Sequence, residues 1–251
     1  MISIIIPTYN RLDLLRQCVN SLREHCPGEG ENYRIQVIAT GSGDEAHWAA
    51  DNGVYGDWLE GATFGQAVNA GMGQVRHNNA ILLNNDTIIQ DDIVAAFQRA
   101  LTLFPSGAVI GARLLYPNGL VQHAGIGFDQ GGLPYNLWRH APAAHPAVNQ
   151  PSYPPALTFA CILIPRSVWQ AVGPLDEGYR NAYEDVDWCL RAREQGYPLH
   201  YVPSVSAIHL EGQSPGRFDH DAESLQHYRE NWSNTGRIWN ALGVYPFQVG
   251  G

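Results

Sequence analysis

The sequence predicts an α/β fold in which helices flank a central sheet that is mixed but mostly parallel. Residues 2–6 form an unbroken β-branched run, and residues 14–22 then carry apolar side chains at helical spacing, as in the first half of a βαβ unit. Residues 82–87 read Leu-Leu-Asn-Asn-Asp-Thr, an apolar run that stops at polar side chains as a buried strand does at its end.

Length and composition place the chain in the globular class. Its 251 residues suffice for one large α/β domain, or two small ones, with a sizeable core. The net charge of −9 argues against a nucleic-acid partner, and four scattered cysteines are expected to be thiols in a reducing compartment. Residues 2–6 follow Met1 without a signal peptide, and no apolar run approaches the roughly 20 residues of a transmembrane segment. We expect a cytoplasmic protein, and peripheral attachment to the inner face of the membrane stays open.

Strands and helices are expected to alternate along the first half of the chain. Asn10 can cap the first helix, and Asp91 with Asp92 can stabilise the N-terminal end of a later one. Gly71 suggests close approach of a ligand. The expected elements are a strand over 34–39, a loop and short helix over 63–72, a strand over 80–86 and an amphipathic helix from about 91 to 104.

After Pro105 the pattern changes to shorter strands separated by glycine and proline. Residues 129–155 read as one long loop, which is uncommon in a compact domain unless it is functional, so we expect the wall of a substrate cleft. The other expected elements are strands over 108–116, 121–128 and 157–164, a helix over 166–172, a helix from about 182, a strand pair over 200–210 and a helix over 219–242.

Asn84, Asn85 and Asp86 stand at the end of a predicted strand, where ligands bind in open α/β sheets. A carboxylate beside amide oxygens suits a hard divalent cation, which commonly holds phosphate oxygens as well. His209 ends a later strand and can supply the second protein ligand. The alternatives are a turn that ends the strand, a glycosylation acceptor at Asn85, and a structural histidine.

Glu184, Asp185 and Asp187 open a predicted helix, and three carboxylates in four residues repel one another. One or two of them can stabilise the helix N-terminus, and Asp187 can pair with Arg191 one turn further on. A carboxylate that faces a cleft can instead act as a general base, because it can take a proton from a hydroxyl nucleophile. Both interpretations stay open on the residues alone.

Residues 41–46 match the G-x-G-x-x-G/A fingerprint of dinucleotide binding, with Asp57 or Glu60 as the acidic residue that follows it. Against this interpretation, Asp44 would lie within the phosphate turn, and the motif follows the second strand instead of the first. Because of the fingerprint match, a Rossmann NAD-dependent oxidoreductase is kept as the rival hypothesis.

Five segments in register resemble the family 2 glycosyltransferases of GT-A fold, and among them the bacterial polysaccharide enzymes that include rhamnosyltransferases. The resemblance extends from Ile2 to about Arg217. It implies a single GT-A domain over 1–251, with a nucleotide-sugar half, an acceptor half and a C-terminal helix. The segments are residues 4–11, 82–87, 117–125, 183–188 and 209–214, and the three parts are 1–110, 111–217 and 218–251.

The resemblance implies an inverting hexosyltransferase of bacterial surface polysaccharide synthesis. Its donor would be a nucleotide-diphosphate sugar, UDP- or dTDP-linked, and its acceptor a hydroxyl of a glycan or lipid-linked glycan. Asp86 and His209 would bind Mn²⁺ or Mg²⁺, and Asp185 would be the base. This agrees with the chemistry, since a metal neutralises charge on the leaving diphosphate. The expected substrate-binding residues are Pro7, Tyr9, Arg11, Asp44, Asn69, Asn84, Asn85, Glu184, Asp187, Trp188, Ser214 and Arg217.

Two positions depart from the family pattern. Asn84 stands where the family's metal motif begins with Asp, which should weaken metal affinity. The second strand ends at Ala39 and Thr40, where the family has an Asp that contacts the base. These departures motivate another hypothesis, a nucleotide- or glycan-binding module without turnover. The intact base and the two metal positions argue against it. The chain could also be a piece of a longer multi-domain enzyme.

Overall fold

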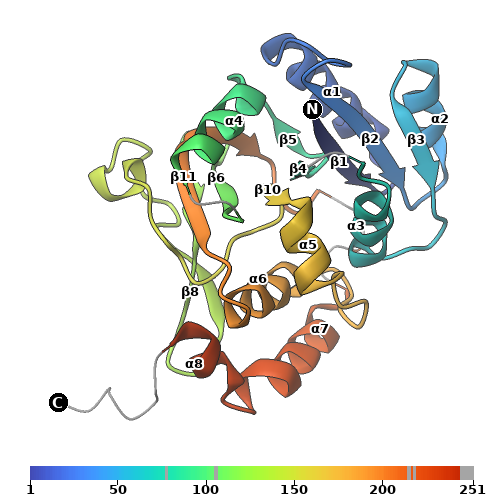
Figure 1. Cartoon of the computed structure of the whole chain (residues 1–251). Helices are drawn as coiled ribbons and strands as arrows, with labels where there is room; N and C mark the ends of the chain where they lie inside the picture. The colour runs from blue at the N-terminus through green and yellow to red at the C-terminus, as the bar shows by residue number, and fades with distance from the viewer. Residues whose placement is uncertain (77–78, 105–106, 214–215, 217–218, 244–251) are drawn as a thin grey trace.

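The computed structural model of the chain describes residues 1–76, 79–104, 107–213, 216 and 219–243 (Figure 1). A nine-stranded sheet forms its centre, and a separate hairpin lies beside it. The sheet strands are β1 (Ile2–Thr8), β2 (Tyr33–Ala39), β3 (Tyr55–Trp58), β4 (Asn79–Leu83), β5 (Thr87–Ile88), β6 (Val109–Leu115), β7 (Val121–His123), β10 (Cys161–Pro165) and β11 (Leu199–His209), and the hairpin strands are β8 (Ile126–Phe128) and β9 (Pro134–Asn136).

Helices cover both faces of the sheet, and none in the described part of the chain has the length and hydropathy to cross a membrane. A 3₁₀ turn over Pro146–Asn149 and a π turn over Arg229–Ser233 complete the secondary structure. The helices are α1 (Leu12–His25), α2 (Asp44–Asp51), α3 (Phe64–Gly73), α4 (Ile93–Leu103), α5 (Arg166–Val172), α6 (Glu184–Glu194), α7 (Asp221–Tyr228) and α8 (Arg237–Leu242).

The sheet has the order β3-β2-β1-β4-β10-β6-β11-β5, with β7 paired to β6. Strands β1 to β4 are parallel, and β6 and β11 run in the same direction, whereas β10 is antiparallel to both of its neighbours. The prediction of a mixed, mostly parallel sheet is confirmed. Because the chain passes from β1 to β2 on one side and returns to β4 on the other, a crevice opens at the carboxyl ends of β1 and β4.

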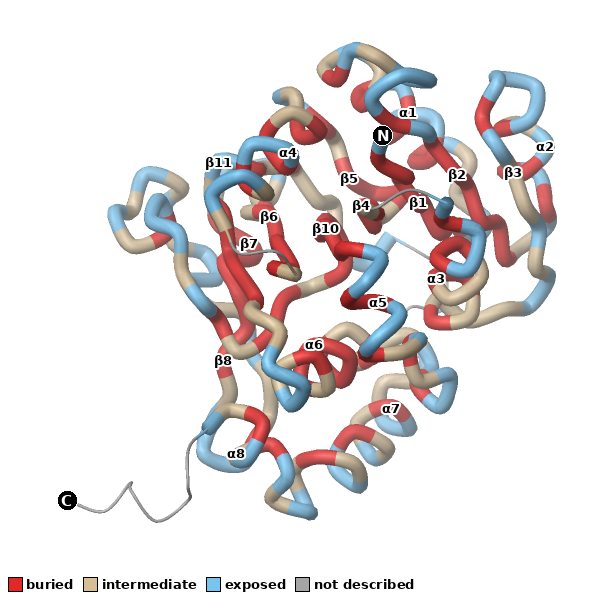
Figure 2. The backbone as a smooth tube through the Cα atoms, viewed as in Figure 1, coloured by how far each residue is buried: buried red, intermediate tan, exposed pale blue. Residues whose placement is uncertain are grey.

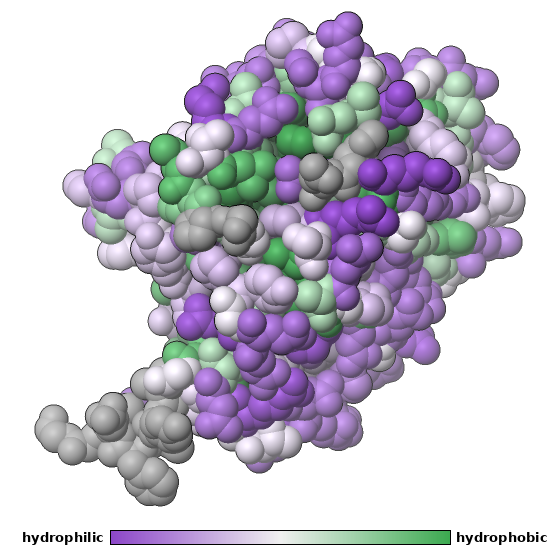
Figure 3. All heavy atoms as spheres, viewed as in Figure 1, coloured by the Kyte–Doolittle hydropathy of each residue, from purple (hydrophilic) through white to green (hydrophobic). Residues whose placement is uncertain are grey.

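Alternating side chains of each central strand enter two hydrophobic cores, one on each face. Along β4, Leu82 joins the core beneath α3, α5 and α6, and Leu83 joins the core beneath α1, α2 and α4. Buried positions follow the strands, whereas exposed positions lie on the outer sides of the helices (Figure 2). Over α6 and α7 the face drawn in Figure 3 is mainly hydrophilic.

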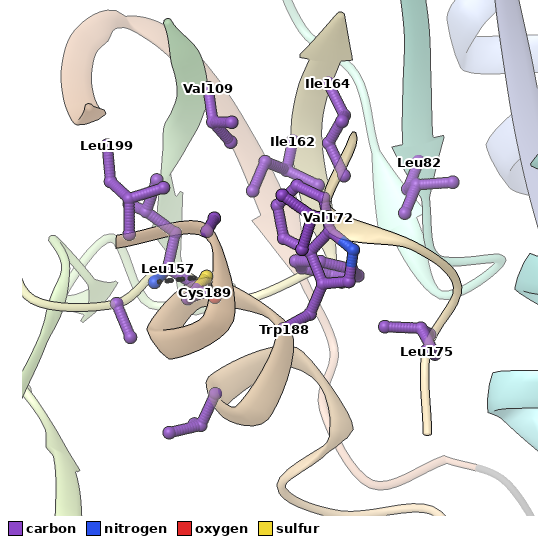
Figure 4. Close-up of a cluster of buried hydrophobic side chains, with 14 of the residues drawn as sticks. Leu82, Val109, Leu157, Ile162, Ile164, Val172, Leu175, Trp188, Cys189 and Leu199 are labelled. Atoms are coloured by element: carbon purple, nitrogen blue, oxygen red, sulfur yellow. Dashed lines mark hydrogen bonds between the residues drawn. The ribbon is translucent and has the colours of Figure 1, made fainter. Parts of the chain in front are cut away.

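Trp188 anchors α6 in the first core (Figure 4). Its side chain is 0% exposed, stacks on Trp169 with ring centroids 5.6 Å apart, and donates a 2.9 Å hydrogen bond to the carbonyl of Gly173. Next to it, the Sγ of Cys189 donates to the carbonyl of Leu157. All four cysteines are free and buried, as expected.

Predictions from the sequence are most accurate where a single run of residues determines the element. Helix α5, for example, has the bounds expected for it, 166–172. Four predicted elements were wrong in extent. The strand over 80–86 ends at Leu83, where a turn follows. The strand over 121–128 is divided after His123, and Gly125 in the break has a φ of 105°. The strand over 157–164 begins only at Cys161. The C-terminal helix is divided into α7, the π turn and α8, with Gly236 at a φ of 68° before α8.

Three further expectations are corrected. The strand pair over 200–210 is one strand, β11, with a register shift between Val202 and Ser206. The loop over 129–155 contains β9 and the 3₁₀ turn. Asn10 does not cap α1, because its Oδ1 accepts a hydrogen bond from the backbone N–H of Ser42. Asp92 does cap α4, through the N–H of Ala95.

Gly71 is a packing position in α3, not a point of ligand approach. A Cβ atom at this position would lie 2.6 Å from Cγ2 of Ile5 on β1. We expect Gly71→Ala to lower the free energy of unfolding by about 1–3 kcal/mol, because the overlap forces the helix away from the sheet. Chemical denaturation measures this change.

Gly73 provides the matched control, since it lies in the same helix and a Cβ there meets no atom within 4 Å. Gly73→Ala should be neutral, or stabilising by up to about 1 kcal/mol, because alanine favours helix. Equal effects of the two substitutions would show that contact with Ile5 is not the reason for glycine at position 71.

His123 is a buried histidine whose two ring nitrogens are both used in the neutral form. Nδ1 donates to Oδ1 of Asn136 at 2.8 Å, and Nε2 accepts from the N–H of Thr158 at 3.5 Å. Burial lowers the pKa of His123 from 6.5 to about 4. The folded protein therefore resists protonation of this ring, whereas the unfolded chain does not.

This difference predicts a dependence of stability on pH. Between about pH 6.5 and pH 4 the unfolded chain binds the proton and the folded chain does not, so the contribution of His123 to stability is present above this window and is lost as the pH falls through it. The loss is on the order of 3 kcal/mol. His123→Gln should remove this part of the slope in denaturation curves recorded across the window, and an unchanged slope would contradict the assignment.

Candidate functional site

A cleft of about 580 Å³ lies at the carboxyl ends of β1 and β4, where the strand order reverses. A larger hollow of about 1120 Å³ lies at the opposite ends of β1 and β2, and it contains none of the predicted site residues. We therefore take the smaller cleft as the candidate site. Eight of the predicted residues line it, namely Pro7, Tyr9, Asn84, Asn85, Asp86, Glu184, Asp185 and His209.

Backbone pairing brings the two predicted metal ligands together. Asp86 immediately precedes β5, and β5 pairs with the end of β11 so that Thr87 lies opposite His209. The N–H of Leu210 donates to the carbonyl of Asp86 at 3.0 Å. As a result, Oδ1 of Asp86 and Nε2 of His209 are 3.0 Å apart.

The neighbours of this pair are polar and mostly buried. Nδ2 of Asn84 lies 3.4 Å from Nε2 of His209, and Oε1 of Gln122 lies 2.6 Å from Nδ1 on the other side of the ring. Asn84 also begins a turn, because its carbonyl accepts hydrogen bonds from the N–H and the hydroxyl of Thr87. The turn expected as an alternative is thus present together with the cluster of ligand side chains.

Asn85 joins the ends of two strands, since its Nδ2 donates a 2.8 Å hydrogen bond to Oγ1 of Thr8 at the end of β1. Its side chain is used in this contact and the residue is only 6% exposed. This position excludes the alternative of a glycosylation acceptor in the folded protein. Asn85 instead ties the segment that follows β4 to the end of β1.

The donor set fits a divalent cation that keeps open positions. In the segments that the structure describes, no three His, Cys, Asp or Glu side chains gather at one point, so the protein offers a pair of such ligands, Asp86 and His209. One carboxylate oxygen and one imidazole nitrogen leave room for water and for phosphate oxygens, the usual companions of Mg²⁺ and Mn²⁺.

Asp185 reaches the same cleft from the first turn of α6. Its Oδ1 accepts from the N–H of Val186 at 2.8 Å, and its Oδ2 accepts from the N–H of Phe159 at 3.4 Å. Tyr183, before the helix, has a φ of 71°, which turns the chain sharply into α6. Negative charge is favoured at this end of a helix, and Asp185 is half-buried, so a carboxylate is held in place at the cleft wall.

Five predicted substrate contacts in the described part of the chain lie outside the cleft lining, namely Arg11, Asp44, Asn69, Asp187 and Trp188. Arg11 donates to a carboxylate oxygen of Asp13 at 2.9 Å and to the carbonyl of Gln213, and the Asp13 contact raises the pKa of the guanidinium. Asp44 begins α2 and accepts from the hydroxyl of Ser42. The structure therefore gives both residues contacts within the protein.

Asn69 is the third residue outside the lining, and it holds α3 to the segment that follows α5. Its Oδ1 accepts from the N–H of Leu175 at 2.8 Å. Its Nδ2 donates to the carbonyl of Leu175 at 3.0 Å and to the carboxylate of Glu177 at 2.9 Å. With these contacts made, the amide serves the packing of the helix.

The assignments of Asp187 and Trp188 to the substrate are corrected, because both side chains are buried in the interior. Asp187 accepts a 2.8 Å hydrogen bond from Nε of Arg191, the pair that the helical spacing predicts, and another from Nε1 of Trp232 at 2.8 Å. Trp188 has no exposed surface. The predicted contacts of Ser214 and Arg217 lie outside the described residues.

Loops and the short strand β9 supply cleft residues that the sequence did not reveal. Asn136 comes from β9, Arg180 and Asn181 precede α6, and His220 precedes α7. None belongs to a spacing pattern that distinguishes it from a surface residue. Thr40 is different, because the sequence already placed it at the end of the second strand, and it does line the cleft.

The glycine-rich turn does not face the cleft. Gly41 packs against Asn10, and Gly43 precedes α2 in a left-handed conformation against Trp58. Asp44 and Glu45 occupy the first turn of α2, where a dinucleotide would place its pyrophosphate, and Glu45 accepts the N–H of Arg11. The arrangement does not support the Rossmann oxidoreductase.

Similarity to known proteins agrees with this geometry. The model of the family described as glycosyl transferase family 2 matches residues 3–124. The O-antigen biosynthesis protein RfbC of Myxococcus xanthus is 26% identical over 231 residues, which cover 85% of this chain and 17% of RfbC. The N-acetylglucosaminyl-diphospho-decaprenol L-rhamnosyltransferase of Mycobacterium tuberculosis is 29% identical over 150 residues, which cover 55% of this chain and 48% of that protein. The chain thus spans less than half of the length of either relative.

A crystal structure of GalNAc-T7 with UDP, GalNAc and Mn²⁺ superposes with a TM-score of 0.71 at 15% identity, over 94% of this chain and 49% of that one. At this identity the likeness concerns the fold. It confirms the expected GT-A fold, and the sequence match confirms the resemblance drawn from five short segments. Residues 3–124 therefore match glycosyl transferase family 2, and the chain has a GT-A fold.

Proposed function

We propose that this protein is a metal-dependent, inverting hexosyltransferase that moves a sugar from a nucleoside-diphosphate sugar to a hydroxyl of a glycan or lipid-linked glycan. The role would be bacterial surface polysaccharide synthesis, at the cytoplasmic face of the membrane. The observation that carries the proposal is the 3.0 Å approach of Asp86 to His209 in the cleft that also holds Asp185. A cation site and a base in one cleft are the two parts that such a transfer needs.

Asp185 is the general base in this proposal. The acceptor oxygen bonds to the anomeric carbon as the bond from that carbon to the diphosphate breaks, and the hydroxyl proton passes to Asp185. The nucleoside diphosphate leaves with the bonding electrons. Attack from the side opposite the leaving group inverts the anomeric configuration. The backbone donors to Asp185 keep its oxygens at the cleft wall.

Asp86 and His209 would hold Mn²⁺ or Mg²⁺. When bound, the cation would offset the negative charge that grows on the departing diphosphate. Arg180 adds a cationic guanidinium to the described part of the lining, and it can serve the same charge. With a net charge of −9 on the whole chain, such local positive charge is needed for an anionic donor.

In this proposal, different parts of the chain bind the donor and the acceptor. Residues 1–110 would supply the donor site, with Pro7, Tyr9 and Thr40 beside the nucleoside, and residues 111–217 the acceptor site, with Asn136 and Glu184. Residues 218–251 would support the acceptor side. Ala39 and Thr40 stand where the family has a carboxylate. We propose that the donor is UDP- or dTDP-linked and that its base is bound without this contact.

Asp185→Asn tests the base. The variant keeps Oδ1 as an acceptor for the Val186 N–H but cannot take a proton, so transfer should fall by about 10²–10⁴-fold while the affinity for the nucleoside diphosphate stays the same. Transfer is measured as release of nucleoside diphosphate in the presence of an acceptor glycan, and binding by calorimetry.

The matched control for this substitution is Glu230→Gln, a carboxylate-to-amide change on the surface of the π turn. It should leave both quantities unchanged. Full transfer activity in Asp185→Asn would reject the base assignment. A wild-type protein that binds donor but transfers nothing would instead support the binding module, for which Ala39 and Asn84 are the motivating residues.

A thermal-shift panel of UDP, dTDP, GDP, CDP and NADH, each with Mn²⁺ or with chelator, tests the metal and the donor together. One nucleoside diphosphate should stabilise the protein only with Mn²⁺, by about 2.7 kcal/mol at about 100 times its Kd, or roughly 5 to 10 °C.

Asp86→Ala and His209→Ala should both abolish this shift, because each removes one of the two protein ligands. An identical shift in chelator would remove the metal from the proposal. A shift with NADH alone would favour the oxidoreductase.

A further inference from the structure

We propose that Gln122 is a positioning residue for His209, which keeps the proton on Nδ1 and presents the unprotonated Nε2 to Asp86. The functional meaning of this role rests on the proposed metal site, but the hydrogen bonds that carry it belong to the chain itself. Gln122 lies on β7, is 3% exposed and does not line the cleft. It therefore acts through His209 and not on a substrate.

The orientation of the Gln122 amide follows from its partners. Its Nε2 lies 3.2 Å from the backbone carbonyl of His209 and 3.4 Å from Oε2 of Glu211, and both of these oxygens accept hydrogen bonds. The NH₂ group must point at them, so Oε1 is the atom that lies 2.6 Å from Nδ1 of His209. An amide oxygen only accepts, and Nδ1 must therefore carry a hydrogen.

A neutral imidazole with its hydrogen on Nδ1 has a lone pair on Nε2. This lone pair faces Oδ1 of Asp86 at 3.0 Å, and Nδ2 of Asn84 lies 3.4 Å away. Two acceptors at such a distance repel each other unless a proton or a cation lies between them. With the opposite tautomer, an N–H would point at the place where a metal must bind, so Gln122 selects the tautomer that can act as a ligand.

Glu211 holds the other end of Gln122. Its Oε2 accepts from the hydroxyl of Tyr116 at 3.0 Å and from Nη2 of Arg139 at 3.1 Å, and Nε of Arg139 donates to the same hydroxyl at 2.7 Å. With these donors around it, the Glu211 oxygen is an acceptor for Gln122, which excludes the flipped amide. The chain of hydrogen bonds extends from Arg139 in the long loop to His209 in the cleft.

A purely structural role for Gln122 makes a different prediction. Gln122 joins β7 to the end of β11, and its loss would then lower stability without changing which ring nitrogen carries hydrogen. The tautomer of His209 separates the two roles, and ¹⁵N NMR of histidine-labelled protein reports it directly. His209→Ala assigns the signal among the ten histidines.

The experiment compares the wild type with Gln122→Leu and Gln122→Glu at about pH 8, above the ordinary histidine pKa. In the wild type, Nδ1 of His209 should carry the hydrogen. Gln122→Leu removes the acceptor, so this preference should be lost and the Mn²⁺ affinity, measured by electron paramagnetic resonance of free Mn²⁺, should fall by about 10 to 100-fold. Gln122→Glu keeps an acceptor for Nδ1 and should keep the tautomer, even if repulsion from Glu211 lowers stability.

Gln36→Leu is the matched control, since Gln36 is also a buried glutamine, on β2, and its side chain donates to Gln74 outside the candidate cleft. It should change neither the tautomer nor Mn²⁺ binding. A wild-type His209 with its hydrogen on Nε2 would overturn the inference without any variant, and so would a tautomer that survives Gln122→Leu. Mn²⁺ binding that survives His209→Ala would overturn the proposed metal site but not the role of Gln122. That role is decided by the tautomer of His209 alone.

Discussion

The pairing of two-residue β5 with the end of β11 is the constraint on which the site depends. It places Thr87 opposite His209 and so brings the carboxylate of Asp86 to the imidazole, from positions far apart in the chain. The strands beneath it supply the rigidity, since β4 and β11 lie in one sheet whose two faces are both covered by packed helices. A metal site of this kind needs ligands held within a fraction of an ångström, and backbone pairing achieves this better than flexible loops.

Several polar side chains around the cleft have hydrogen-bond partners within the protein. Asn85 joins Thr8, Asp185 accepts two backbone N–H groups, and Gln122 uses both ends of its amide. Buried polar groups of this kind are costly when they lack partners and specify one arrangement when they have them. The shape of the cleft is therefore set before any ligand binds. The side chains proposed to carry out the reaction are the few that point into the cleft, Asp86, Asp185 and His209.

The sequence predicted the parts of this arrangement that depend on local pattern. The β-branched run of β1, the helical spacing of α1 and the polar end of β4 each indicated their own structure, and the short motifs indicated the family whose model matches residues 3–124. Tertiary pairing decided the rest. Nothing in a lone glutamine at position 122 shows that β7 will place it beside His209, and the carboxylate of Asp187 resembles that of Asp185 until α6 packs and turns it toward Trp232. The loop residues of the cleft carry no periodicity at all.

The antiparallel strand β10 affects how this protein folds while it is being synthesised. It inserts between β4 and β6, so the sheet begun by residues 2–83 keeps an unpaired edge at β4 until residues 161–165 have been made. During synthesis that edge, apolar on both faces, offers free N–H and C=O groups to any other extended chain. A ribosome that stalled after residue 83 and before residue 161 would hold a nascent chain prone to aggregation. A truncated protein that ended between these residues would keep the unpaired edge of β4 permanently.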